Sequence, residues 1–399
     1  MRSLLAALVC LSTSLSTAFV NGPSCTRKDI ALFAASRREF LQDSVTTAAG
    51  VASSGLWLPS QPAVAATPVV GASIDLPPMG LGAWAWGDPI MWGYNPSQDE
   101  ELRRVFDYAV ANSKSEKTLF DTAELYGFGR SESLLGEFSK DYSDNVEIAT
   151  KFAPLPFRSS ATNVVKACEA SVKRLGGRPI DLYQVHFPNG WSNAEYWDGL
   201  AMVYEKGLVK SVGVSNYGSD ALRACHKALA ERGIPLATNQ IQYSLLYRWP
   251  EMNGLLDTCK ELNIKVLAYS PLALGFLTGK YSQEKLPSGP RNALGKQLFQ
   301  TSDFDNLVDT MKQVASQHSG ATVSQVAINW TRAKGTIPIP GARNISQVKQ
   351  NYAALEWDLS PKEVQTLDEA AAKVTTFITP EKSPFPKEDI NTHLKMFDS

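Results

Sequence analysis

The sequence predicts a single (β/α)8 barrel, the TIM-barrel class of α/β fold, preceded by a separate targeting segment. From Thr67 onward, short Val/Ile/Leu-rich runs alternate with amphipathic helical stretches, which is typical of a parallel sheet with crossover helices. Eight such runs recur at about 25–35 residues per unit, the size of one β/α unit in a barrel. Most runs end in polar residues, and the strands of a barrel present such residues together on one face.

The predicted strands are separated by helical patterns. Apolar residues at i, i+3 and i+4 predict helices within Glu101–Val110, Val164–Leu175 and Leu255–Leu262, and Ser131 is expected to cap a further helix. We expect the barrel to span residues 67–378 and a tail to span 379–399, with a doubly wound sheet as the alternative fold. The predicted strands are a first one ending near Gly80–Trp84, then Thr118–Tyr126, Val146–Phe152, Ile180–Phe187, Ser211–Ser215, Leu236–Gln242, Val266–Ser270 and Thr336–Ile339.

Composition and charge exclude several classes of protein. The 399 residues contain 39 Lys and Arg against 40 Asp and Glu, so no basic nucleic-acid-binding surface is expected. The 5 Cys are too few for a disulfide framework, and we expect Cys168, Cys225 and Cys259 to be buried free thiols within helices. Because no apolar run reaches the ~20 residues of a membrane span, stable membrane insertion is not expected.

Residues 1–66 have a composition unlike the rest of the chain, with few acidic residues and many Ala, Ser and Thr. The apolar run Leu4–Leu11 and the junction Ala18-Phe19 resemble a plastid signal peptide followed by a transit peptide. The segment Ser36-Arg37-Arg38-Glu39-Phe40-Leu41 resembles a twin-arginine signal, and Ala63-Val64-Ala65 offers a processing site. We expect a plastid location. The thylakoid lumen, reached by the twin-arginine route, and the stroma remain as alternatives.

Polar side chains at the ends of three neighbouring predicted strands form a candidate proton-transfer site. Lys151 interrupts an apolar strand, where a buried charge needs a partner, and Asp121 on the preceding strand is the natural one. An ammonium group near Tyr126 favours the phenolate, so we expect the pKa of Tyr126 to lie below its usual value and to make Tyr126 a usable proton donor. His186, one strand further on, is placed to hydrogen-bond a carbonyl oxygen.

Seven segments of the sequence, in order, resemble the aldo-keto reductase family across residues 76–372. They are D-T-A-x-x-Y-G, A-T-K, D-L-Y-x-x-H-x-P, G-V-S-N, N-Q-x-x-Y-S-L, A-Y-S-P-L and I-P-G-A. Each alone is a weak signal, but seven in the same order are specific. The resemblance implies that Asp121, Tyr126, Lys151 and His186 are the catalytic tetrad. It also implies reduction of an aldehyde or ketone to the alcohol, with Tyr126 as the general acid.

The resemblance further implies that NADPH or NADP+ binds without a Rossmann motif. Arg343 suits a 2′-phosphate because its guanidinium is planar, always charged and bidentate. Gly341 stands where some branches of the family have Lys, which weakens the predicted preference for NADP. The residues matching the family's cofactor positions are Gly82, Ser215, Asn216 and Gln240, then Tyr269, Ser270, Leu272 and Gly275, and finally Gly341, Arg343, Gln347 and Asn351.

The remaining expectations concern the substrate, metals and partners. Trp84 and Trp191 follow predicted strand ends and are candidates for the walls of a substrate pocket, with a core position as the alternative. No metal site is expected, because the His residues lack metal-ligand spacing. Two functions remain open: a monomeric reductase of a small carbonyl substrate, and a nicotinamide-binding regulatory or sensor protein with little turnover.

Overall fold

The computed structural model describes residues 74–142, 144–155, 157–189, 192–289 and 291–374. The predicted presequence of residues 1–66, the tail of residues 379–399 and Trp191 lie outside this range, so the predicted domain limits stay predictions. Within the described ranges, no helix is both long and apolar enough to cross a bilayer.

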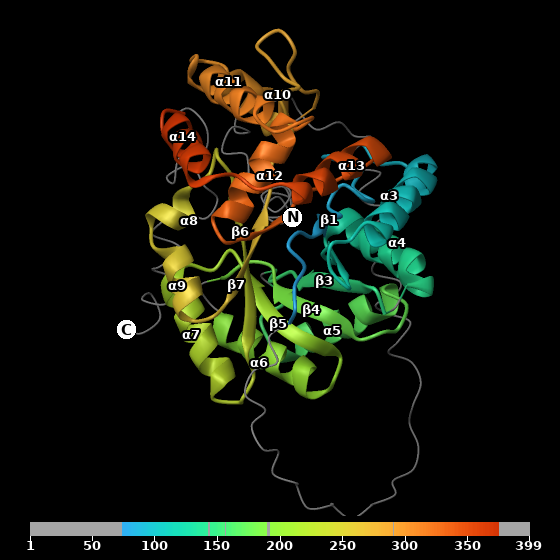
Figure 1. Ribbon diagram of the computed structural model, residues 1–399. Coiled ribbons are helices and arrows are strands. Elements are labelled where there is room, and N and C mark those ends of the chain that lie inside the picture. Colours follow the sequence, from blue (N-terminus) through green and yellow to red (C-terminus); the bar gives the residue numbers. More distant parts are fainter. Residues whose placement is uncertain (1–73, 143, 156, 190–191, 290, 375–399) are drawn as a thin grey trace, which may run out of the picture. The chain divides into compact units, whose positions relative to one another are not determined.

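Eight parallel strands form one sheet in chain order, and the sheet closes on itself (Figure 1). The amide of Gly80 donates to the carbonyl of Pro338 at 3.0 Å, and that of Gly82 donates to Pro340 at 3.1 Å, which joins the first strand to the last. The predicted (β/α)8 barrel is confirmed, and the doubly wound alternative is wrong. The strands are β1 (Leu81–Gly82), β2 (Thr118–Asp121), β3 (Val146–Phe152), β4 (Ile180–Val185), β5 (Val209–Ser215), β6 (Leu236–Gln242), β7 (Lys265–Tyr269) and β8 (Ile337–Ile339).

Helices surround the strands (Figure 1). Their apolar residues are buried in the core, as the spacing predicts. In α3, for example, Leu102, Val105 and Phe106 are buried. The helices that follow the strands are α3 (Asp99–Ala111), α4 (Arg130–Phe138), α5 (Ala161–Arg174), α6 (Asn193–Glu205), α7 (Ser219–Ala230), α9 (Leu255–Glu261), α12 (Val323–Ala333) and α13 (Ile345–Ala353). Additional helices are α8 (Trp249–Met252), α10 (Arg291–Leu298), α11 (Asp303–Ser316) and α14 (Pro361–Ala371).

Two predicted strands extend too far. β4 ends at Val185, and β2 ends at Asp121, after which the chain turns into the short 3-10 helix η3 (Tyr126–Gly129). The strand does not reach Tyr126 because Leu125 already has a helical conformation, with φ of −79° and ψ of −21°. The predicted cap is also wrong: α4 begins at Arg130, and the Ser131 hydroxyl instead donates to the carbonyl of Ala83 at 3.0 Å.

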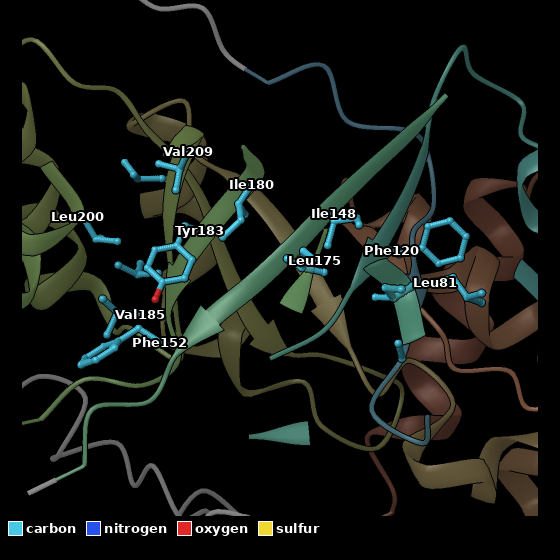
Figure 2. Close-up of a cluster of buried hydrophobic side chains, with 14 of the residues drawn as sticks. Leu81, Phe120, Ile148, Phe152, Leu175, Ile180, Tyr183, Val185, Leu200 and Val209 are labelled. Carbon is cyan, nitrogen blue, oxygen red and sulfur yellow. The ribbon is translucent and has the colours of Figure 1, made fainter. Parts of the chain in front are cut away.

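Outward-facing strand residues form the main core beneath the helices. Figure 2 shows part of it, with Phe152 and Val185 close together at one end and Leu81 and Phe120 at the other. All four of these side chains are buried. The three Cys of the described chain, Cys168, Cys225 and Cys259, are buried and free, as predicted.

Inward-facing strand residues form two layers of opposite character. The apolar layer holds Leu119, Ala149, Leu182, Ala237 and Leu267, and Ile74 and Leu76 pack against it. Side chains alternate along a strand, so residues two and four positions after a residue of the apolar layer also point inward. They lie nearer the carboxyl end of the strand. These positions are occupied by Asp121, Lys151, Gln184, His186 and Tyr269. The polar site therefore lies directly above an apolar plug.

Candidate active site

The carboxyl ends of the strands surround a pocket of about 500 Å³. Trp84 and the predicted catalytic residues Asp121, Tyr126 and His186 line it, while Lys151 lies fully buried behind Asp121. The structure thus brings the predicted residues together, apart from Trp191, which is outside the described chain. The predicted cofactor residues lining the same pocket are Gly82, Ser215, Asn216, Gln240, Tyr269, Ser270, Leu272, Gly275, Gly341, Arg343, Gln347 and Asn351.

Asp121 and Lys151 form a buried ion pair. The Lys151 ammonium donates to both carboxylate oxygens of Asp121, at 2.9 and 2.7 Å, and to the carbonyl of Thr122 at 2.7 Å. The Gln240 amide also donates to Asp121, at 2.6 Å. Burial raises the pKa of Asp121 and lowers that of Lys151, and the attraction between the two charges opposes both shifts. All three protons of the ammonium therefore have acceptors within this pair and its backbone neighbour.

Tyr126 is half-buried, and its phenol oxygen makes no hydrogen bond to the described residues. The Lys151 nitrogen lies 5.0 Å from the centre of the tyrosine ring. Burial raises the pKa of Tyr126 well above its usual value, and the negative charge of Asp121 adds to this effect. The expectation that the pKa of Tyr126 lies below its usual value is wrong, because burial and the negative charge of Asp121 outweigh the effect of the nearby ammonium.

His186 stands beside Tyr126, with ring centres 5.8 Å apart and planes at 77°. Burial, followed by the positive charge of Lys151, lowers the pKa of His186 well below its usual value, so the imidazole is neutral near pH 7. The Asn216 amide donates to the His186 carbonyl at 3.1 Å and fixes the backbone there. Nowhere in the described ranges do three or more His, Cys, Asp or Glu side chains gather as metal ligands would.

The loop after β1 supplies a wall of the pocket. The Trp84 ring lies against Tyr126, with centres 6.1 Å apart, and the Trp84 indole donates to the Asp88 carboxylate at 3.1 Å. A Cβ atom on Gly127 would lie 2.2 Å from the carbonyl oxygen of Gly87, so the close approach of this loop to η3 requires glycine. This contact holds Trp84 beside the residue that precedes Gly127.

The turn after β7 lines another part of the pocket with strained backbone. Ser270 and Leu274 have φ of 53° and 57°, in the left-handed region, which costs of order 1–3 kcal/mol for each non-glycine residue. The Tyr269 hydroxyl donates to the Asn216 side chain at 3.0 Å and links β7 to β5. Such strain at a pocket wall is typical of a ligand-binding segment.

Three cations in the pocket have no acidic partner. Arg343, Arg291 and Lys280 line it, and none takes part in an ion pair with the described residues. Burial, followed by repulsion from Arg291, lowers the pKa of Arg343. Arg343 also lies just before Asn344, the N-cap of α13. An uncompensated positive region of this kind fits a ligand with several phosphates.

The sequence analysis missed several pocket residues. Arg291 and Lys280 follow β7 in a segment with no strand-end motif, so only folding brings them to the pocket. Gln350 did carry a signal, because it lies three residues after Gln347 and shares a helix face with it. The other missed residues are Ala85, Phe187, Pro271, Leu274, Thr278, Tyr281, Ser324, Ile339 and Pro340.

Known proteins with similar sequences and structures match this chain across the whole barrel. The sequence profile of the Aldo/keto reductase family matches residues 78–372. Chloroplastic pyridoxal reductase of Arabidopsis thaliana is 43% identical over 316 residues, which are 75% of this chain and 84% of that protein.

Two solved structures resemble the barrel at low sequence identity. An aldo-keto reductase from Klebsiella pneumoniae, crystallised with NADPH, has a TM-score of 0.59 and 26% identity, covering 76% of this chain and 95% of that one. Glycerol dehydrogenase from Gluconobacter oxydans has a TM-score of 0.66 and 26% identity. The match covers 77% of this chain and 96% of that one. The chain therefore belongs to the aldo/keto reductase family of NAD(P)H-dependent oxidoreductases.

Proposed function

We propose that this protein reduces a small aldehyde to the alcohol with NADPH, and that pyridoxal is a substrate. The observation that carries the proposal is that Tyr126 and His186 share one pocket with the unpaired cations Arg291 and Arg343. A proton donor and a phosphate-binding region thus lie within reach of a single bound cofactor. Pyridoxal is suggested by the name of the chloroplastic relative, which acts on that aldehyde.

In this proposal Tyr126 is the general acid. When bound, NADPH would supply the hydride for the carbonyl carbon. As charge develops on the carbonyl oxygen, Tyr126 gives it the phenolic proton, which the raised pKa keeps in place at neutral pH. Neutral His186 donates an N–H to the same oxygen. Lys151, held by Asp121, stabilises the phenolate until solvent returns the proton.

The proposal assigns the cofactor's two ends to different residues. Ser215, Asn216 and Gln240 hold the carboxamide, and the Gln240 carbonyl oxygen does so because its amide nitrogen already donates to Asp121. Tyr269 would hold the nicotinamide, and the left-handed turn after it would hold the pyrophosphate. Arg343 would hold the adenosine 2′-phosphate.

The proposal is tested by offering the purified full chain a panel of carbonyl compounds and following NADPH absorbance. We expect NADPH to be consumed with pyridoxal and the corresponding alcohol to form in equal amount. Turnover of other aldehydes without pyridoxal would overturn the substrate but not the reaction. Tight NADPH binding with no turnover of any carbonyl compound would instead favour the regulatory or sensor function.

Replacing Arg343 with Met is expected to raise the KM for NADPH about tenfold or more, because a charge-assisted contact to the 2′-phosphate is lost. The KM for NADH, which lacks this phosphate, is expected to change little. Both values come from initial rates at saturating aldehyde. An equal rise for the two cofactors would assign Arg343 to another part of the molecule.

The pH profile of reduction is expected to be level near neutrality. The pKa of His186 is lowered and that of Tyr126 is raised, so neither group changes protonation between about pH 7 and 9. Activity falls only as pH drops through the depressed histidine pKa or rises through the elevated tyrosine pKa. The measurement is kcat/KM for the aldehyde across that range and below it at saturating NADPH. A fall centred near the usual histidine pKa of about 6.5 would show that His186 titrates normally.

We propose a plastid location, supported by the presequence pattern and by the chloroplastic relative. A fusion of the full chain to a fluorescent protein is expected to enter plastids. The Arg37→Lys/Arg38→Lys variant separates the two compartments. Stromal signal in both forms would exclude the lumen, whereas loss of lumenal signal in the variant alone would support the twin-arginine route.

A further inference from the structure

Trp92 lies close to two arginine side chains of the pocket. It belongs to the loop that follows β1, and its ring is half-buried. The guanidinium of Arg291 is 5.0 Å from the ring centre, and that of Arg343 is 5.4 Å from it. Arg343 also donates to the Trp92 carbonyl at 3.0 Å, so the ring and the backbone of Trp92 both contact the proposed 2′-phosphate region.

The same ring contacts the catalytic end of the pocket through its neighbour. Trp92 and Trp84 meet edge to face, with ring centres 5.5 Å apart and planes at 87°. Trp84 in turn lies against Tyr126. An unbroken series of ring contacts therefore runs from Arg343 through Trp92 and Trp84 to Tyr126.

The electrostatics at Trp92 depend on whether an anion is present. Each guanidinium is attracted to the aromatic ring, but the two cations repel one another, and no described carboxylate pairs with either. An anion bound by both would remove the repulsion and favour the arrangement in which both contact the ring. A ligand shifts a conformational equilibrium only through such a difference in interaction.

We propose that Trp92 is a positioning residue that couples occupation of the 2′-phosphate region to the placement of Trp84 beside Tyr126. The inference rests on the proposed function, because it takes NADPH as the cofactor. It adds that the 2′-phosphate lowers the KM for the aldehyde as well as the KM for the cofactor. NADPH then organises the substrate wall more fully than NADH does.

The kinetic test compares the KM for the aldehyde at saturating NADPH and at saturating NADH. We expect it to be about fivefold lower with NADPH in the unmodified protein, a typical size for coupling between sites. Trp92→Leu removes the ring and is expected to equalise the two values. Trp92→Phe keeps an aromatic face and is expected to restore most of the difference, which a merely structural role would not do. A Trp92→Leu variant with the original ratio would overturn the proposal.

A binding measurement tests the coupling without turnover. The fluorescence of Trp92 is obtained by subtracting the tryptophan emission of the Trp92→Phe variant from that of the unmodified protein. Quenching of this emission by acrylamide then measures how accessible the Trp92 ring is to solvent. Adenosine 2′,5′-bisphosphate is expected to reduce the quenching of this component, whereas adenosine 5′-monophosphate is not. Equal effects of the two nucleotides would overturn the proposal.

A failure of the proposed function can be distinguished from a failure of the proposed coupling. Trp357→Phe is the matched control, because Trp357 stacks on His318 outside the pocket and its removal should leave the nucleotide effect unchanged. Absence of turnover on every aldehyde would overturn the proposed function while the fluorescence result still decides the coupling. Normal turnover with no selective protection of Trp92 would overturn the coupling alone.

Discussion

Replacing Tyr126 with Phe is expected to lower kcat for carbonyl reduction by about 10²–10⁴-fold, the usual contribution of a general acid. The change removes the phenolic proton and leaves the ring that packs between Trp84 and His186. Because the protein is otherwise intact, NADPH affinity, measured by fluorescence quenching, is expected to be unchanged. The readout is single-turnover reduction with NADPH already bound.

The control for this experiment is Tyr108→Phe. Tyr108 lies on α3, packs edge to face with Tyr352 and does not line the pocket. Removing the Tyr108 hydroxyl should leave kcat unchanged. If Tyr126→Phe retained full activity, another group would be donating the proton, and the proposed role of Tyr126 would be wrong.

Replacing Lys151 with Met is expected to lower the free energy of unfolding by about 3–5 kcal/mol, the usual result of removing one partner of a buried ion pair. The change leaves the Asp121 carboxylate buried, with Gln240 as its remaining side-chain donor. Catalysis should fall as well, because the phenolate left on Tyr126 loses its nearest positive charge. Urea unfolding measures the first effect, and initial rates measure the second.

The double variant Asp121→Asn/Lys151→Met separates stability from catalysis. It removes both charges together, so no unpaired buried charge remains and part of the lost stability is expected to return. Activity is not expected to return, because the positive charge near Tyr126 is still missing. A double variant as unstable as Lys151→Met alone would mean that packing around the lysine stem, and not the unpaired carboxylate, causes the loss.

The order of strands and the identity of the site residues were predictable because both depend on local patterns. Alternation along a strand places residues two apart on the same face, so the step from Ala149 to Lys151 needs no tertiary information. Leu182, Gln184 and His186 likewise share one face, because they are two residues apart along the chain. Strand ends were less predictable, because Leu125 already turns into a helical conformation although its apolar side chain fits a strand pattern.

The direction of the Tyr126 pKa was not predictable from the sequence. The sequence indicates that a lysine lies near the tyrosine, but the effect of the lysine on the pKa depends on where its three protons go. In the structure they go to Asp121 and Thr122, and burial then dominates the pKa of Tyr126.

The sequence by itself predicted the barrel through strand period and helix spacing, and its motifs, through their resemblance to the family, predicted the tetrad and the candidate cofactor residues. Only the tertiary structure decided that Arg291 joins Arg343 on the ring of Trp92. These residues come from three segments far apart in the sequence, whose approach depends on long-range packing. The charge state of Tyr126 was decided at the same level, since burial and pairing are properties of the folded chain.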